Sequence, residues 1–531
     1  MLLFFTRGFF KHQYILMVAQ FFASHWYGGI ALWQGVGVVL GGGAVLGGAG
    51  AEIAQVPGSG VAPRLCAAQL PGAINSVIGQ PAFERSRWGV LVQTLGNRPA
   101  TRQTLFAYDA SKLFTPASNT KLLTTAAALH TLGGDYRIRT SVYQEGTETN
   151  TRLWIVGRGD PSLGMPQLQQ LARQLQQQGI RQVATLIGQD GYFLGDAISP
   201  YWDWEDVQAG YGAAVNSLIY EQNAIDLTLF PQQVGQPLRV QWKYPSDASQ
   251  WQVVNRSRTV DQQTEEFLKV NRDFATPTVV IEGQLQTGAS PAAIAISAPA
   301  PGHRFLQQFR TALASAGIQV KQTQLTSTPL PPGLPEVATL ESPSLIQLAR
   351  VVNQESDNLA AEVLLKTLGR SQQPQTKSTE AGLNVLRTAL TQLGVNPESY
   401  AIADGSGLAR RNLVSPEALV QTLQNMYQTP AGQAYRASLS IAGVNGTLRS
   451  RFRNTPAAKI VQAKTGTLTG VTALSGYITP VNHPPLVFSI IVNHAVAPTL
   501  ALRQAVDEIV LHLANLHRCE MTSLAHRSQQ Q

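Results

Sequence analysis

Three short motifs of this chain carry side chains whose types and spacing suit nucleophilic chemistry. They are Ser118-Asn119-Thr120-Lys121, Ser356-Asp357-Asn358 and Lys464-Thr465-Gly466-Thr467, and each occurs once. Residues three apart on a helix lie on the same face, so Lys121 can reach the Ser118 hydroxyl. A serine is a weak nucleophile until a base removes its proton, and a lysine of lowered pKa can be that base. Burial and a second cation, for which Lys464 is the candidate, would lower the lysine pKa.

The first two motifs fall in segments with helical periodicity. The pattern predicts a helix over Pro116–Leu132 and a second helical region over Ser344–Leu368. At the start of the first helix, Ser118 would lie beside backbone N–H groups that can stabilise an oxyanion. The third motif directly precedes two apolar runs, Val471–Ile478 and Leu486–Val492, which predict adjacent antiparallel strands.

The region between the first two motifs has a different pattern. From about residue 137 to residue 337, short alternating runs separated by turns predict strands, interrupted by a helix at Gln167–Gln178. Residues 231–296 are more polar and strand-like, which indicates a module nested inside a larger insertion. Further elements are predicted outside the insertion: strands at Trp88–Leu95 and Gln103–Ala107, a helix at Ser415–Tyr427 with Ser415 as N-cap, and a helix at Leu500–Leu513.

Composition excludes several classes of protein. Of 531 residues, 44% are hydrophobic and only 14% are charged, which excludes a disordered chain and a coiled coil and leaves a core-forming protein of several domains. The net charge is +8, but lysine and arginine are scattered and do not alternate with aromatic residues, so nucleic-acid binding is not predicted. A mildly basic surface would suit an anionic polymer.

The N-terminal 51 residues predict export. Arg7 and Lys11 precede a stretch from Gln13 to Ala51 without Asp, Glu, Lys or Arg. It ends in Ala49-Gly50-Ala51, an A-x-A pattern that a signal peptidase could cleave. The stretch also exceeds the roughly 20 residues that span a membrane, so residues 1–51 are either a signal peptide or a membrane anchor. Both alternatives predict an exported protein of the periplasm or cell envelope, with membrane contact only through this segment.

The three motifs together form the S-x-x-K, S-D-N and K-T-G set of penicillin-binding proteins and class A β-lactamases. With the segments Gly157–Leu163, Asp404–Leu408 and Ala442–Leu448, the chain resembles class C low-molecular-mass penicillin-binding proteins over roughly residues 70 to 515. These form the D-alanyl-D-alanine carboxypeptidase/endopeptidase family (peptidase S13 family). Arg158 and Asn445 depart from the family pattern, and both departures are expected to alter turns rather than chemistry.

The resemblance implies an α/β (α+β) penicillin-binding/β-lactamase-like transpeptidase fold, an antiparallel sheet flanked by helices, with two nested β-rich insertion domains. More than two hundred residues separate Ser118 from Ser356, far more than a compact β-lactamase holds between these motifs. The expected parts are a signal peptide or anchor at 1–51, a discontinuous penicillin-binding catalytic domain at 64–136 and 338–516, insertion domain II at 137–230 and 297–337, nested insertion domain III at 231–296, and a polar tail at 517–531.

The resemblance also implies the catalytic roles. Ser118 would be the acylated nucleophile and Lys121 its general base. Ser356 would relay a proton to the leaving D-alanine amine. Asn358 would orient both the substrate amide and Lys121.

The third motif would bind the substrate. Lys464 would attract the terminal carboxylate, helped by the hydroxyls of Thr465 and Thr467. The backbone N–H groups of Ser118 and Thr467 would form the oxyanion hole. Gly466 would let the substrate backbone approach the strand closely.

Three further observations complete the candidate site. Asp404 and Ser406 lie in a glycine-rich turn, which either serves turn geometry alone or supports the active site, beside which the family places it. Asp160 precedes a proline and is predicted to be a structural turn residue. Cys66 and Cys519 are the only cysteines, and the sequence leaves open whether they form a disulfide or remain thiols.

The predicted function is that of a serine-type D-Ala-D-Ala carboxypeptidase or endopeptidase, acting on peptidoglycan stem peptides through an acyl-enzyme and acylated by β-lactam antibiotics. No metal or cofactor is predicted, since the nine histidines show no H-E-x-x-H spacing. One alternative is a β-lactamase, against which stand the long insertion and the lack of an identifiable glutamate base for deacylation. The other alternative is a non-catalytic wall-binding protein, against which stand the intact Ser118, Lys121 and Lys464.

Overall fold

The computed structural model describes residues 65–96, 99–147 and 150–518. Two compact units share these residues: Ala224–Pro299 form the smaller unit, and the described residues on either side of that segment form the larger one. The predicted export segment at 1–51 and Cys519 lie outside the described residues. None of the helices in the described ranges is long and apolar enough to cross a membrane.

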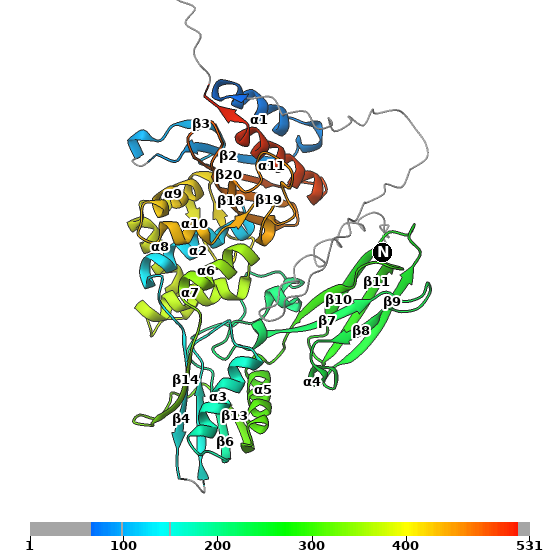
Figure 1. The fold of residues 1–531 in the computed structure, drawn as a ribbon, viewed down its shortest axis with the longest axis vertical. Helices are drawn as coiled ribbons and strands as arrows, with labels where there is room; N and C mark the ends of the chain where they lie inside the picture. The colour runs from blue at the N-terminus through cyan, green and yellow to red at the C-terminus, as the bar shows by residue number, and fades with distance from the viewer. Residues whose placement is uncertain (1–64, 97–98, 148–149, 519–531) are drawn as a thin grey trace, which may run out of the picture. The chain divides into compact units, whose positions relative to one another are not determined.

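A six-stranded sheet, called the central sheet below, lies between helices in the upper part of the larger unit in Figure 1, with neighbouring strands antiparallel throughout. It combines strands from near the start of the described chain with strands from its end. In sheet order they are β17 (Ser440–Ile441), β18 (Val461–Leu468), β19 (Val471–Ile478), β20 (Leu486–Asn493), β2 (Arg87–Thr94) and β3 (Thr104–Tyr108).

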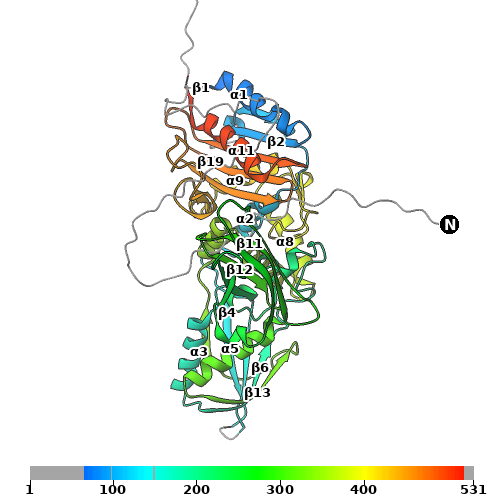
Figure 2. The ribbon, with the colours of Figure 1, turned by 90° about the vertical axis from the view of Figure 1, so that its right-hand side faces the viewer.

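Both faces of this sheet are covered by helices, because successive side chains of a strand point to opposite faces. Leu474 and Phe488 pack in one core with α1 (Leu70–Ile78) and α11 (Thr499–Ala514) (Figure 2). Ala473 and Tyr477 pack in a second core on the other face. The helices of that second core are α2 (Thr120–Leu132), α6 (Leu345–Arg350), α7 (Asn358–Gln372), α8 (Ser378–Gln392), α9 (Pro416–Tyr427) and α10 (Gly432–Ala437).

The predicted helical region Ser344–Leu368 is interrupted at the second motif. After α6, one turn of π-helix (Val351–Glu355) ends at Ser356, which adopts a left-handed conformation with φ 62°. Asp357 then caps α7, since its carboxylate accepts a hydrogen bond from the Ala360 N–H at 2.8 Å. The region is helical on both sides of this break, as predicted, but the periodicity of the flanking apolar residues does not report a single left-handed residue.

A second sheet of the larger unit has five strands in the order β13-β6-β5-β4-β14. Two helices, α3 (Met165–Gln177) and α5 (Pro301–Ser315), share its apolar core (Figure 2). The strands are β4 (Arg139–Glu145), β5 (Arg152–Val156), β6 (Gln182–Gln189), β13 (Gln319–Thr326) and β14 (Glu336–Glu341). β6 runs parallel to both β5 and β13.

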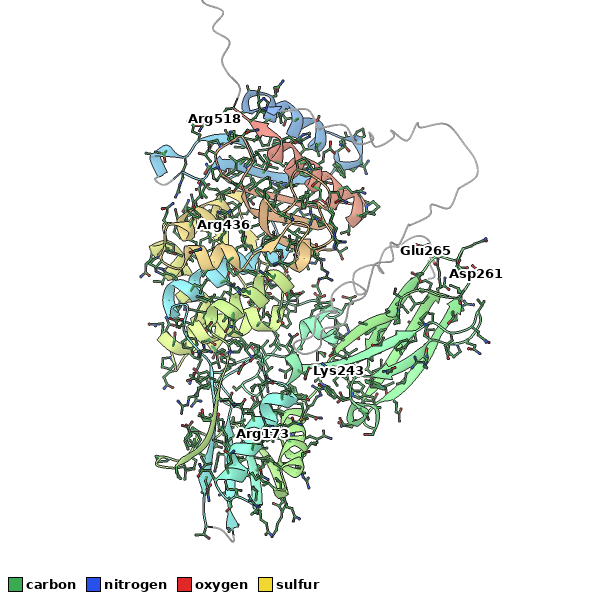
Figure 3. The ribbon with its side chains drawn as sticks, in the orientation of Figure 1. Arg173, Lys243, Asp261, Glu265, Arg436 and Arg518 are labelled. Atoms are coloured by element: carbon green, nitrogen blue, oxygen red, sulfur yellow. The ribbon has the colours of Figure 1, made fainter. Side chains whose placement is uncertain are left out.

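The smaller unit, Ala224–Pro299, is built from two three-stranded sheets with one common core. The first sheet contains β12 (Ala292–Ser297), β7 (Ala224–Phe230) and β8 (Arg239–Trp242). The second contains β10 (Phe267–Arg272), β11 (Thr278–Gln286) and β9 (Gln252–Val260). A short helix, α4 (Pro245–Ala248), follows β8. Lys243, labelled in Figure 3, forms an ion pair with Asp226 at 3.2 Å. The unit begins before residue 231, because β7 pairs with β8 and β12. The other predicted domain boundaries stay predictions.

The two ends of the described chain meet. β1 (Leu65–Cys66) pairs in parallel with β21 (Leu516–His517), and Cys66 is in register with His517. Cys66 is therefore held next to the segment that leads to Cys519. The disulfide between the two cysteines stays a prediction.

Several predicted elements are confirmed. Val471–Ile478 is β19, and it pairs antiparallel with β20 as predicted. The predicted helix Leu500–Leu513 is α11. Ser415 is the N-cap of α9, and its hydroxyl accepts the Ala418 N–H at 3.0 Å.

Replacing this cap tests its contribution to the fold. The variant Ser415→Ala leaves the Ala418 N–H without its side-chain acceptor, so we expect a loss of about 1 kcal/mol of stability. Denaturant unfolding followed by circular dichroism measures it. The exposed helical residue Ser76 supplies the control, since Ser76→Ala should change stability by less than about 0.5 kcal/mol. Equal unfolding midpoints for both variants would show that the cap contributes nothing.

Candidate active site

Ser118 lies in a short 3-10 helix, Ala117–Asn119, that leads directly into α2. Ala117 has a φ of 49°, which is rare for a residue with a side chain and indicates a strained turn held by its surroundings. Asn493 of β20 holds the backbone of Thr115, two residues before this turn. Its Oδ1 accepts the Thr115 N–H at 2.7 Å and its Nδ2 donates to the Thr115 carbonyl at 3.0 Å. The serine is thus presented half-buried on a fixed turn.

A buried row of polar side chains anchors the same turn to the sheet. Asn119 Nδ2 donates to the Ser475 hydroxyl at 2.8 Å, and the Ser475 hydroxyl donates to that of Ser489 at 2.9 Å. Both serines lie on the face of β19 and β20 that packs against α2, and all three residues are buried. Buried polar groups are costly unless paired, so this row specifies where the turn sits.

The Lys121 side chain is fully buried, and its amine faces three oxygen atoms. Nζ donates to Ser118 Oγ at 3.0 Å, to Asn358 Oδ1 at 2.6 Å and to the Ser406 carbonyl oxygen at 2.6 Å. Burial lowers the pKa of Lys121 to about 8, although the nearby carboxyl groups raise it in part. The structure therefore brings together the serine and lysine of the first motif with the asparagine of the second.

This arrangement determines what the neutral amine can do. A carbonyl and an amide oxygen only accept hydrogen bonds, whereas a hydroxyl can also donate. When Lys121 loses its proton, its two remaining hydrogens can stay on Asn358 Oδ1 and Ser406 O. Its lone pair then points to Ser118 Oγ, which is the geometry a general base needs.

The orientation of Asn358 is fixed from the other side. Its Nδ2 donates to the Tyr211 carbonyl oxygen at 3.0 Å, so its Oδ1 is turned toward Lys121. Tyr211 belongs to a short 3-10 helix, Gly210–Gly212, in the long segment between the first two motifs. This segment also contacts the turn at Asp404, through a hydrogen bond from Trp202 Nε1 at 2.9 Å.

The second lysine, Lys464, connects the second and third motifs. It is buried, and Nζ donates to Ser356 Oγ at 2.9 Å and to the Thr465 carbonyl at 2.9 Å. Burial, and then the charge of Lys121, hold the pKa of Lys464 well below its usual value. An arriving carboxylate would restore the charged form. Thr465 Oγ1 donates to Thr447 Oγ1 at 2.8 Å, which fixes the threonine hydroxyl beside this lysine.

The third motif lies at the edge of the central sheet, beyond the end of β17. β17 pairs with β18 only at Gln462 and Ala463. From Lys464 onward, this edge of β18 faces no other strand among the described residues. An unpaired strand edge can bind an extended peptide through backbone hydrogen bonds.

Gly466 packs closely against the turn that precedes the nucleophile. A Cβ at this position would lie 2.6 Å from the Pro116 carbonyl oxygen and 3.3 Å from Ala117 Cβ. The turn before the nucleophile therefore occupies space that a side chain at position 466 would need, and the predicted close approach of a substrate backbone stays a prediction. Gly407 has a similar role, with φ +86° and a Cβ position 1.9 Å from the Ala117 carbonyl oxygen.

The Asp404–Gly407 turn supports the site through its backbone. Asp404 is buried and accepts hydrogen bonds from the N–H groups of Gly407 and Ala409 at 2.7 and 2.6 Å. The adjacent Ser406 contributes its carbonyl to Lys121, while its hydroxyl accepts the Leu408 N–H at 3.3 Å. Ser406 thus contacts the base through its backbone.

Three other residues noted in the sequence lie outside helices and strands. Asp160 accepts hydrogen bonds from the N–H and hydroxyl of Ser162 at 2.9 and 2.6 Å, and burial raises its pKa to about 6. Arg158 donates to the Arg139 carbonyl at 2.9 Å. Asn445 accepts the Ile441 N–H at 2.7 Å.

Comparison with known proteins decides the family. The D-Ala-D-Ala carboxypeptidase 3 (S13) family matches residues 70–516, which include all three motifs. The chain belongs to this family. The resemblance recognised in the motifs is thereby confirmed, and with it the enzyme class of a serine-type D-Ala-D-Ala carboxypeptidase.

Relatives in this family have similar length. The chain is 32% identical over 457 residues to a D-alanyl-D-alanine carboxypeptidase of an Actinomadura species, a match that covers 82% of this chain and 84% of the relative. It is 28% identical to the penicillin-sensitive carboxypeptidase A of Dictyostelium discoideum, over 81% of this chain and 87% of that protein.

The predicted fold is confirmed by a solved structure. Penicillin-binding protein 4 of Haemophilus influenzae superposes with a TM-score of 0.73 over 83% of this chain and 98% of that one, at 23% sequence identity. At this level of identity the likeness concerns the fold. It places the central antiparallel sheet and its flanking helices in the predicted penicillin-binding class.

Sequence reasoning missed three residues of this S13 site. Glu362 accepts the N–H groups of Gly405 and Ser406, and a lone glutamate within the apolar run Leu359–Leu365 was a signal that could have found it. Thr447 lies inside a segment already matched to the family. Tyr211 acts through its backbone carbonyl, for which no sequence signal exists.

The close approach at Gly466 gives a direct test. In Gly466→Ala the new methyl group would push on the Pro116 carbonyl and displace Ser118, so acylation by labelled penicillin should slow roughly ten- to hundredfold. Gly72 is the control, because nothing lies within 4 Å of its Cβ position. Gly72→Ala should react like the wild type. Equal acylation rates for both variants would show that the contact with the nucleophile turn is unimportant.

Proposed function

We propose that this S13 enzyme trims or cleaves peptidoglycan stem peptides through an acyl-enzyme on Ser118. The observation that carries the proposal is the buried Lys121 amine, 3.0 Å from Ser118 Oγ, with its other contacts made to acceptor-only oxygens. The named relatives, a D-alanyl-D-alanine carboxypeptidase and a penicillin-sensitive carboxypeptidase, support the same chemistry.

In the proposed reaction, Ser118 Oγ attacks the carbonyl carbon of the penultimate D-alanine while its proton passes to Lys121 Nζ. The backbone N–H groups of Ser118 and Thr467 stabilise the oxyanion that forms. The C–N bond to the terminal residue then breaks, and through the Ser356 hydroxyl its amine takes the proton that Lys121 received from Ser118. Water hydrolyses the resulting ester and regenerates the Ser118 hydroxyl.

Substrate binding is proposed at the edge of β18. The stem peptide would lie along this edge as an added strand, with its terminal carboxylate on Lys464 and the hydroxyls of Thr465 and Thr467. The second hydrogen of Asn358 Nδ2 would hold the substrate amide, while Oδ1 stays on Lys121. The Ser356 hydroxyl accepts a hydrogen bond from Lys464 Nζ at 2.9 Å, which supports its place beside the bound substrate.

Three further predictions accompany this function. Export through residues 1–51 would deliver the enzyme to the cell envelope, where peptidoglycan lies. A disulfide between Cys66 and Cys519 would secure the pairing of β1 with β21. The catalytic domain would be discontinuous, at 64–136 and 338–516, with the insertion domains between its two parts.

Ser118→Ala tests the function. The variant should form no adduct with labelled penicillin, and its release of D-alanine from a stem peptide should fall by roughly four to six orders of magnitude. Mass spectrometry detects the adduct on the wild type and on the control Ser76→Ala. Equal labelling of Ser118→Ala would overturn the assignment of the nucleophile.

Measurements on the wild type separate the proposed function from its two alternatives. Rapid multiple turnover of a chromogenic cephalosporin by the wild type would favour a β-lactamase. Binding of wall fragments by a wild type that releases no D-alanine and forms no adduct would favour a non-catalytic wall-binding protein. The proposed function predicts D-alanine release together with a long-lived adduct.

The acylation rate should depend on pH through Lys121. Below its pKa of about 8 the amine is charged and has no lone pair for the Ser118 proton. The rate of acylation by penicillin at low concentration should therefore rise with pH up to about 8 and then level off. A rate that falls over this range would contradict Lys121 as the base.

A further inference from the structure

A buried carboxyl group, Glu362, lies behind the base and has no part in the reaction as described. It projects from α7 one turn after Asn358 and is 3% exposed. Its Oε1 accepts the N–H groups of Gly405 and Ser406 at 2.9 and 2.8 Å. Burying a carboxylate on an apolar face of a helix costs free energy. The two hydrogen bonds to the turn explain only in part why a glutamate stands at this position.

The turn that Glu362 holds contacts the helix of the nucleophile at two points. The Ser406 carbonyl accepts from Lys121 Nζ at 2.6 Å, and the Gly405 carbonyl accepts from the Thr124 hydroxyl at 2.7 Å. Ser406 therefore bonds to Glu362 through its N–H and to Lys121 through its carbonyl. The position of this carbonyl sets the direction in which the neutral amine presents its lone pair.

We propose that Glu362 is a positioning residue for the reaction: it holds the Gly405–Ser406 turn that orients Lys121, and it adds a negative charge behind this base to those of Asp404 and Asp357. The inference rests on the proposed function, because it takes Lys121 as the base of acylation. Glu362 contacts the turn rather than the substrate, so it acts only through Lys121.

Charged groups face Glu362 from three elements. Asp404 lies on the turn, Lys121 on α2, and Lys366 on the next turn of α7. The Lys366 amine donates to the Asp196 carbonyl at 2.7 Å. Asp404 accepts hydrogen bonds from four N–H donors, those of Gly407, Ala409, Asn412 and Trp202.

The negative charge of Glu362 raises the pKa of Lys121. Burial, and then the charge of Asp404, raise the pKa of Glu362 to about 7. When ionised, Glu362 opposes the effect of burial on the pKa of Lys121, because it stabilises the ammonium form. Removing this charge should make Lys121 a free base at lower pH.

The variant Glu362→Gln separates charge from geometry, because a glutamine Oε1 can accept the same two N–H bonds. We expect the rising limb of the pH profile for penicillin acylation of Ser118 to move down by roughly half to one pH unit. The plateau rate should stay within about threefold of the wild type. Glu362→Ala also removes the acceptor, and its plateau should fall roughly tenfold or more.

Asp190 provides a matched control outside the site. Its Oδ1 also accepts two backbone N–H groups, those of Ser217 and Leu218 at 2.8 and 2.9 Å. Asp190→Asn should leave the rising limb unchanged, so a shift confined to Glu362→Gln supports the charge effect. Thermal unfolding of each variant verifies that it is folded. If Glu362→Ala does not fold, the pH profile of Glu362→Gln alone is the test.

Two outcomes would overturn the inference. A rising limb in Glu362→Gln that coincides with the wild type would remove the role of the charge. A plateau that falls as far in Glu362→Gln as in Glu362→Ala would remove the role of the acceptor. A wild type that penicillin never acylates at Ser118 is a different result, because it overturns the proposed function whatever the residue at 362.

Discussion

The site depends on keeping one lysine buried and able to lose its charge. An ammonium group in a dry pocket needs acceptors for its hydrogens, and a neutral amine needs somewhere to direct its lone pair. The three contacts of Lys121 meet both needs, since two partners can only accept and the third is the nucleophile. Too many carboxylates nearby would keep the lysine charged. Without any carboxylate nearby, no negative charge would stabilise its buried ammonium form. The neighbouring acidic groups balance these two effects.

The fold supplies these contacts from parts of the chain that are far apart in sequence. The nucleophile turn is held by the central sheet, through Asn493 and the buried row that starts at Asn119. The two glycines at positions 407 and 466 let neighbouring backbone pack against this turn without side chains between them. The strained conformation of Ala117 is the local cost of this packing, and the surrounding structure stabilises it. Rigidity of the serine is thus a property of the whole domain.

Much of the site was predictable from the sequence, because the three motifs combine rare residue types with elements of clear periodicity. The helix after Ser118 and the strand pair after Lys464 both follow from apolar spacing. The break at Ser356 could not be predicted, since one left-handed residue leaves no trace in that spacing. The contact of Gly466 with Pro116 was equally hidden, because it joins segments that are distant in the sequence. Glu362 was missed because a single acidic residue on a helix usually faces solvent.

The hydrogen bond from Asn358 to the Tyr211 carbonyl has a consequence for how such enzymes diverge. A backbone acceptor is present whatever side chain the residue carries, so evolution can exchange the amino acid at position 211 without disturbing the amide. A change in the length of this loop would instead move the carbonyl away. Natural selection should therefore act here on insertions and deletions more than on residue identity. The length of the loop around position 211 and the orientation of Asn358 are therefore linked, even where the sequence of that loop changes.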